Sequence, residues 1–95
     1  MTAEPRSQRS DWMAAFTDYC QALPAEDAVG CPECGSRTLR LLFPGAPDTR
    51  QGICFFWCDT CRYGMFHHRM VAPDKVEVIA PPDPRLEDMP NFINV

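Results

Sequence analysis

Short length, two cysteine pairs and a series of apolar segments that alternate with polar residues predict a small, metal-stabilised, β-rich domain. The chain has 95 residues, 45% of them hydrophobic, which suits one domain and is not typical of a disordered protein. A compact unit of about fifty residues buries too little apolar surface to be stable without a metal, disulfides or a partner. We predict an N-terminal arm and helix over residues 1–28, a metal-bound domain over 29–80, and an acidic, proline-rich, extended tail over 81–95.

An amphipathic helix is predicted over residues 10–23. Ser10 is placed to cap the first turn, and Asp11 favours the positive end of the helix dipole. Pro24 follows and ends the helical pattern. Apolar residues recur at helical spacing along one face, namely Trp12, Phe16, Tyr19 or Cys20, and Leu23. This face either packs on the rest of the domain or docks on a partner protein.

Three to four antiparallel strands are predicted over residues 37–43, 53–57, 63–71 and 75–80. Apolar and polar residues alternate along the first of these segments, and the second is dense in aromatic residues. Residues 44–52 carry two prolines and two glycines, so we expect a loop there. The N-terminal helix and the C-terminal tail complete the predicted architecture.

The cysteines Cys31, Cys34, Cys58 and Cys61 form two C-x-x-C pairs on either side of predicted strands. Each C-x-x-C turn brings two sulfurs to one side of a tight loop, and two turns together give four thiolates about 2.3 Å from one metal ion. Gly35 suits a backbone that turns its amides toward sulfur, and Gly64 is a candidate for the same role in the second pair. One structural Zn²⁺ is expected, and iron is the alternative because tetrahedral sulfur sites accept both.

The motifs Cys31-Pro32-Glu33-Cys34-Gly35 and Cys58-Asp59-Thr60-Cys61-Arg62-Tyr63-Gly64 resemble those of the zinc-ribbon superfamily of rubredoxin-like folds. The resemblance covers residues 31–80 and implies a ribbon of strands around a metal. Rubredoxins carry a glycine after each pair, whereas an arginine follows the second pair here, and this departure favours zinc over iron. Zinc ribbons serve in transcription factors, polymerase subunits, ribosomal proteins and enzymes, so the resemblance implies a fold and a metal rather than one activity.

Charge and the N-terminal sequence restrict the classes of function. Residues 1–23 contain no apolar run typical of a signal peptide, and no segment approaches the length of a membrane span. Paired C-x-x-C motifs in such a chain favour metal over disulfides, so we expect a cytoplasmic protein without a membrane partner. The net charge is −4, with arginines in the middle and acidic ends, which is unfavourable for binding a phosphate backbone.

Several residues remain beyond the metal motif. Both faces of the 53–57 strand are apolar, so the outer face must be covered by the helix, by Phe92-Ile93 of the tail, by a partner protein or by a dimer mate. Cys20 and Cys54 are expected to be buried cysteines, although Cys54 is also a candidate alternative ligand. The candidate partner contacts are Trp12, Phe16, Phe56, Arg62, His67 and His68.

The expected function is a protein-interaction or accessory module of a larger enzyme or complex, with zinc in a structural role. The alternative is a nucleic-acid-associated ribbon of the transcription or translation type, in which bases stack on the aromatic rings. Arginines would then supply the positive charge, namely Arg37, Arg40, Arg62 and Arg69. A closed four-cysteine site lacks the open position of catalytic zinc, so we do not expect an enzyme. Catalysis by His67, His68 or Cys54 is the remaining alternative.

Overall fold

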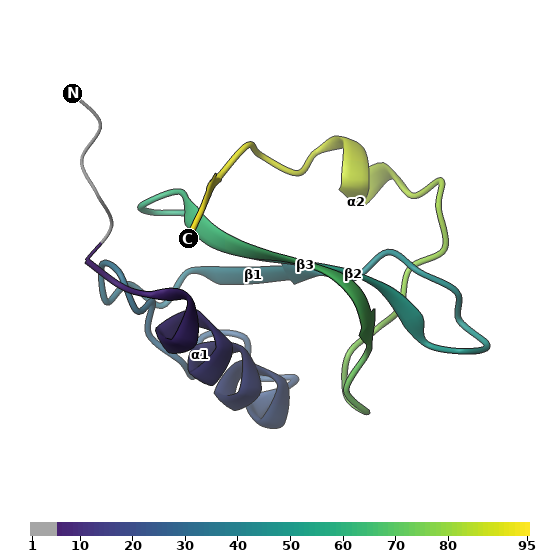
Figure 1. The fold of residues 1–95 in the computed structure, drawn as a ribbon, viewed down its shortest axis with the longest axis horizontal. Helices are drawn as coiled ribbons and strands as arrows, with labels where there is room; N and C mark the ends of the chain where they lie inside the picture. The colour runs from purple at the N-terminus through teal and green to yellow at the C-terminus, as the bar shows by residue number, and fades with distance from the viewer. Residues whose placement is uncertain (1–5) are drawn as a thin grey trace.

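The computed structural model describes residues 6–95 as a four-stranded sheet with a helix on one face and the C-terminal tail on the other (Figure 1). Residues 1–5 of the predicted N-terminal arm lie outside the described residues. The elements in chain order are α1 (Arg9–Ala22), β1 (Leu39–Leu42), β2 (Gln51–Cys58), β3 (Tyr63–Val71), α2 (Pro84–Glu87) and β4 (Ile93–Asn94).

The sheet is mixed and has the strand order β1-β2-β3-β4. Both β1 with β2 and β2 with β3 are antiparallel, as the sequence predicts. The fourth strand differs from the prediction, because it comes from the tail and runs parallel to β3. A sheet of antiparallel strands alone is therefore wrong for the edge formed by β4.

The predicted strand over residues 75–80 does not form. Within it, Ile79 makes one isolated bridge with Pro44. The side chains of Val76 and Ile79 are both buried, and a spacing of three does not fit the two-residue period of a strand. The guanidinium of Arg50 donates to the carbonyl oxygens of Pro73 and Val76, both at 2.7 Å. These bonds hold the segment in a turn that aims its apolar residues at the core.

Helix α1 begins one residue earlier than predicted. Gln8 occupies the capping position, and its N–H donates to the Asp11 carboxylate at 2.8 Å. Ser10 lies inside the first turn and is exposed, so its predicted capping role is wrong. The helix ends at Ala22, just before Leu23 and Pro24, because proline cannot continue it.

The apolar face of α1 packs on the sheet. Trp12, Phe16 and Tyr19 surround the ring of Phe56 in edge-to-face geometry, with centroid distances of 5.8, 5.6 and 5.2 Å. Trp12 and Phe56 are both 0% exposed. This arrangement is favourable for aromatic rings, whose positive edges meet negative faces. The sequence left open whether this face packs on the rest of the domain or docks on a partner protein, and in the structure it packs within the domain.

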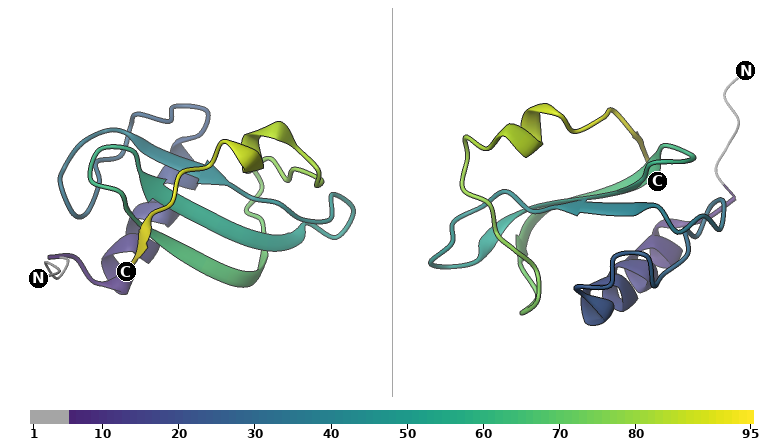
Figure 2. Two further views of the ribbon diagram at one scale, coloured as in Figure 1. Left: turned by 90° about the horizontal axis from the view of Figure 1, so that it is seen from above. Right: turned by 180° about the vertical axis from the view of Figure 1, so that it is seen from behind.

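The C-terminal tail covers the opposite face of the sheet (Figure 2). The ring of Phe92 stacks on Trp57 with a centroid distance of 5.9 Å and an interplanar angle of 8°. The N–H of Val95 donates to the carbonyl of Gly64 at 2.8 Å. A Cβ at Gly64 would lie 2.7 Å from both the Phe92 ring and the Trp57 Cβ, so the tail can approach only over a glycine. The predicted extended tail is thus a strap that contains α2 and β4.

Candidate metal centre

The four predicted metal ligands come together at one end of the sheet. Cys31 and Cys34 lie in the loop before β1, while Cys58 ends β2 and Cys61 lies in the turn before β3. The Sγ atoms of Cys31 and Cys61 are 3.7 Å apart, as are those of Cys34 and Cys58, and all four sulfurs lie within 4.8 Å of one another. A tetrahedron with metal–sulfur bonds of about 2.3 Å has edges of about 3.8 Å, so the cluster fits a metal ion.

The two cysteine turns share one backbone conformation. Gly35 follows the first pair with φ 79°, and Arg62 follows the second pair with φ 63°. The N–H of Gly35 donates to the carbonyl of Cys31 at 2.9 Å, and that of Arg62 donates to the carbonyl of Cys58 at 3.0 Å. Arg62 itself takes the left-handed conformation, so the role considered for Gly64 is wrong. The arginine thus takes the same left-handed backbone conformation as the glycine of the first turn.

Hydrogen bonds reach the two buried sulfurs from the flanking chain. The N–H of Glu33 lies 3.3 Å from Cys31 Sγ and donates to it. The hydroxyl of Thr38 lies 3.4 Å from Cys58 Sγ and also contacts the Thr60 hydroxyl at 2.7 Å. Such donors spread the charge of a thiolate and orient it toward the metal. The cysteine spacing does not reveal Thr38, and the available signal is a hydroxyl just before the strand that pairs with the one ending at Cys58.

The two more accessible cysteines have contrasting acidities. Burial raises the pKa of Cys34, but bonds from the side chain and backbone of Ser36 and from neighbouring thiols outweigh it and hold the pKa at about 7. Burial raises the pKa of Cys61 to about 11, against the lowering effect of the Tyr63 N–H. Ser36 and Tyr63 each lie two residues beyond the second cysteine of their pair, so the support repeats. Metal binding requires the thiolates and therefore releases the remaining thiol protons.

The first cysteine turn is also tied to α1. The Glu33 carboxylate accepts the backbone N–H groups of Arg6 and Ser7, each at 2.9 Å, and the Ser7 hydroxyl at 2.7 Å. Ser7 Oγ in turn accepts the indole N–H of Trp12 at 2.9 Å. The N–H of Arg6, then the two donors of Ser7, hold the pKa of Glu33 below its usual value. A chain of hydrogen bonds thus joins the candidate metal loop to the most buried residue of the helix.

The predicted partner contacts divide into two groups. Trp12, Phe16 and Phe56 belong to the hydrophobic core. Their rings pack on one another, so they offer no surface to a partner in this fold and the prediction for them is corrected. Arg62 is exposed, whereas His68 is exposed and His67 partly so. These three remain candidate contacts.

The histidines and the two other cysteines lie apart from the four-sulfur cluster. Nδ1 of His67 lies 2.8 Å from the carbonyl oxygen of His68, whose ring contacts that of Phe66. Neither histidine lines either of the two described cavities. Cys20 and Cys54 are buried, and burial raises their pKa to about 11 and about 12, respectively. Both thiols are therefore protonated near neutral pH and unsuited to act as nucleophiles.

One of the arginines considered for nucleic-acid binding, Arg40, forms an ion pair within the chain. Arg40 Nε lies 3.2 Å from the Asp59 carboxylate. The other oxygen of Asp59 accepts the indole N–H of Trp57 at 2.9 Å. The positive charge and the polar edge of the ring are thus directed toward this carboxylate.

Comparison of the chain with models of known protein families, with curated proteins and with solved structures found no match. Within residues 6–95, no helix combines the length and the apolar character needed to cross a membrane.

Proposed function

We propose that the four clustered cysteines hold one structural zinc ion and that the protein is a zinc-ribbon accessory module that binds another protein. The observation that carries the proposal is the closed set of four sulfurs, with paired distances of 3.7 Å. Zinc has no redox chemistry and accepts tetrahedral thiolates. It would join the loop before β1 to the turn between β2 and β3 and so stabilise a domain with a small core.

Binding rather than catalysis is supported by what surrounds the cluster. Four thiolates complete the tetrahedral coordination of zinc, so no open coordination position remains for a reacting water. The protonated thiols of Cys20 and Cys54 are buried, and His67 and His68 lie outside the described cavities. A reducing compartment such as the cytoplasm suits the proposal, because thiolates there remain available to the metal.

A protein partner is favoured over a nucleic acid by the distribution of charge. The net charge of −4 opposes binding to phosphates. Of the four arginines considered for that role, Arg40 pairs with Asp59. The aromatic rings that would stack on bases are also committed, since Trp57 stacks on Phe92 and Phe56 is buried.

The metal is tested by elemental analysis of protein purified without added metal, with circular dichroism recorded before and after chelation. One zinc per chain and loss of the folded spectrum on chelation are the expected results. One iron per chain would instead indicate a rubredoxin-like electron carrier. Retention of the folded spectrum without metal would contradict the structural role.

The class of partner is tested by titrating single-stranded oligonucleotides into the metal-loaded protein at low and moderate salt. We expect no binding that weakens steeply with salt. A salt-dependent complex that is lost when Arg37 and Arg62 are both replaced by glutamine would favour the nucleic-acid alternative. Both side chains are exposed, so the replacement leaves the core intact and reports on contact alone.

A further inference from the structure

Solvent reaches the four clustered cysteines to very different extents. Cys58 is 0% exposed and Cys31 is 5% exposed, whereas Cys61 is partly buried. Cys34 is exposed, and it is the only exposed cysteine among the six of the chain. Oxidation of a cysteine follows access to its thiolate, so a reagent in solvent would meet the cluster at Cys34.

The surroundings of the two cysteine turns explain this difference in exposure. Gly35, next to Cys34, is exposed, and a Cβ built on this glycine would meet no atom within 4 Å beyond its chain neighbours. In the second turn, the tail lies against the equivalent position, because the N–H of Ile93 donates to the carbonyl of Arg62 at 2.8 Å. The first turn therefore stays open to solvent, while the strap partly covers the second.

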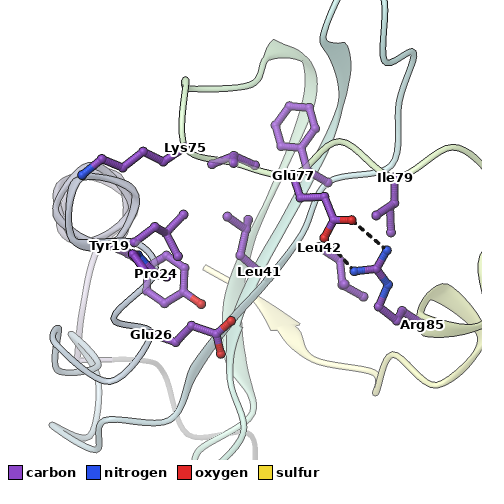
Figure 3. A pocket seen from close by; sticks show the side chains of 12 residues that line it. Tyr19, Pro24, Glu26, Leu41, Leu42, Lys75, Glu77, Ile79 and Arg85 are labelled. Carbon is purple, nitrogen blue, oxygen red and sulfur yellow. Dashed lines mark hydrogen bonds and ion pairs between the residues drawn. The ribbon is translucent and has the colours of Figure 1, made fainter.

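The two described cavities lie away from the cluster. The larger, of about 520 Å³, lies between α1 and β1, and Tyr19, Leu41 and Arg85 are among the residues around it (Figure 3). No cysteine of residues 6–95 lines this cavity. The smaller cavity is lined by one cysteine, Cys20, which is 4% exposed and does not belong to the cluster. Cys34 is thus the accessible part of the four-sulfur site.

The sulfur in contact with Cys34 belongs to a buried ligand of the other turn. Cys34 Sγ lies 3.7 Å from Cys58 Sγ. A disulfide forms when two sulfurs approach to about 2 Å, so this pair needs only a modest movement. Cys58 is shielded from direct attack, because it is 0% exposed. One cysteine is thus placed to react with an oxidant and its neighbour to complete a disulfide.

We propose that Cys34 is the site at which a hydroperoxide oxidises the cluster, so that Cys34 and Cys58 form a disulfide and release the metal. With hydrogen peroxide, the Cys34 thiolate attacks one oxygen, the O–O bond breaks, and a sulfenic acid forms as hydroxide leaves. The Cys58 thiolate then attacks the sulfenic sulfur, forms the S–S bond and expels a second hydroxide. The two sulfurs together lose two electrons, and the peroxide gains them.

The disulfide removes two of the four ligands. Structural zinc sites use four ligands, so Cys31 and Cys61 alone do not retain the ion. The new bond still joins the loop before β1 to the end of β2. A dithiol reductant reverses the step, because its thiolates take over the disulfide and return both cysteines to thiols. This inference rests on the proposed metal site and adds a reversible response to oxidants.

The first experiment follows oxidation of the native full chain. The protein is loaded with zinc, its metal content is measured, and hydrogen peroxide is added in small molar excess. A colorimetric chelator reports released zinc, dimedone traps sulfenic acid in a parallel sample, and peptide mapping by mass spectrometry locates the modified cysteines. We expect the dimedone label on Cys34, a first disulfide between Cys34 and Cys58, and one zinc released for each disulfide. A first label or first disulfide at other cysteines would overturn the inference.

Cys34→His is the decisive variant, because zinc also accepts one histidine beside three thiolates. Cys61→His is its matched control, since it makes the same change at the other ligand that is not fully buried and keeps Cys34. Each variant is loaded with zinc and its metal content is measured first. We expect peroxide to release zinc from Cys34→His about tenfold more slowly than from Cys61→His. Equal rates would contradict the role of Cys34.

The peptide map of the native chain needs no substitution, so it decides the inference even if one of the variants fails to bind zinc. A native chain that holds no metal before peroxide is added would contradict the proposed metal site. A zinc-loaded chain that resists peroxide, or that is oxidised first at another cysteine, would overturn only the inference drawn for Cys34. The two failures are therefore distinguished by the metal content at the start.

Discussion

The two faces of the sheet are covered with very different thoroughness. On one face, α1 places three aromatic rings around Phe56, and both Leu39 and Met65 beside it are 0% exposed. On the other face, the tail contributes one stacked pair, Phe92 on Trp57, and leaves Ile93 56% exposed. The helix face is therefore the hydrophobic core of the domain, whereas the tail is a strap over an aromatic surface.

The cysteine cluster lies where these two layers meet. Toward the helix, Glu33 in the first cysteine turn binds the backbone of Ser7, which accepts the indole N–H of Trp12. Toward the tail, the carbonyl of Arg62 in the second turn accepts the N–H of Ile93. A metal that holds both turns would thus stabilise both layers, so we expect perturbations to cost less stability the farther they lie from this shared site.

Chelation of the metal should have the largest effect, because it removes the link between the two cysteine turns. We expect helical circular dichroism and tryptophan fluorescence to change together in one transition, since Trp12 and Trp57 report on opposite faces. Adding zinc back should restore both signals. Separate transitions would show that the two faces fold independently and would contradict the shared role of the metal.

Truncation of the helix-side core should have the next largest effect. Phe56→Ala leaves a cavity among three rings and should destabilise the domain by about 3–5 kcal/mol. Phe55→Ala is the matched control, because Phe55 is the neighbouring residue of the same strand and is only partly buried on the other face. Urea denaturation of the metal-loaded variants measures the difference. Equal losses would mean that the two faces contribute alike.

Truncation of the strap should cost less. Phe92→Ala removes the ring stacked on Trp57 and is expected to destabilise the domain by about 1–2 kcal/mol. Tryptophan fluorescence should shift because the indole of Trp57 becomes more exposed, while the helical circular dichroism should stay the same. A loss of stability as large as that for Phe56→Ala would show that the strap is part of the core.

Acidification should reveal the smallest effect, at Glu33. Its pKa is lowered in the fold, chiefly by the N–H of Arg6. The stability from this carboxylate is therefore fully present above its usual pKa and is lost as pH falls through the lowered value. The stability difference between the native protein and Glu33→Gln should shrink on acidification. A difference that is constant with pH would exclude a role for the charge.

Residue types and spacing predicted the features that depend on local chemistry. The two C-x-x-C pairs identified the four clustered cysteines, and helical periodicity identified α1 to within one residue at each end. Burial of Cys20 and Cys54 also followed from the pattern of their neighbours. The four-cysteine cluster was predictable because each cysteine pair is a local turn whose geometry depends little on the rest of the fold.

The incorrect predictions involve contacts between distant segments. Residues 75–80 alternate enough to indicate a strand, but Arg50 binds the carbonyls of Pro73 and Val76 and holds a turn. The conformation of Arg62 was missed because positive φ is usually assigned to glycine. Strand β4 could not be identified from its own residues. It forms because Gly64, about thirty residues earlier in the sequence, lets the tail approach β3 closely.

The most direct test of the central claim compares Cys58→Ala with Cys54→Ala. Both cysteines are 0% exposed and lie on the same face of β2, but only Cys58 belongs to the four-sulfur cluster. Elemental analysis of each variant, purified without added metal, gives the metal content per chain. The account predicts that Cys54→Ala retains one metal ion and that Cys58→Ala loses it together with the folded spectrum. Full metal content in Cys58→Ala, or its loss in Cys54→Ala, would contradict the assignment of the site.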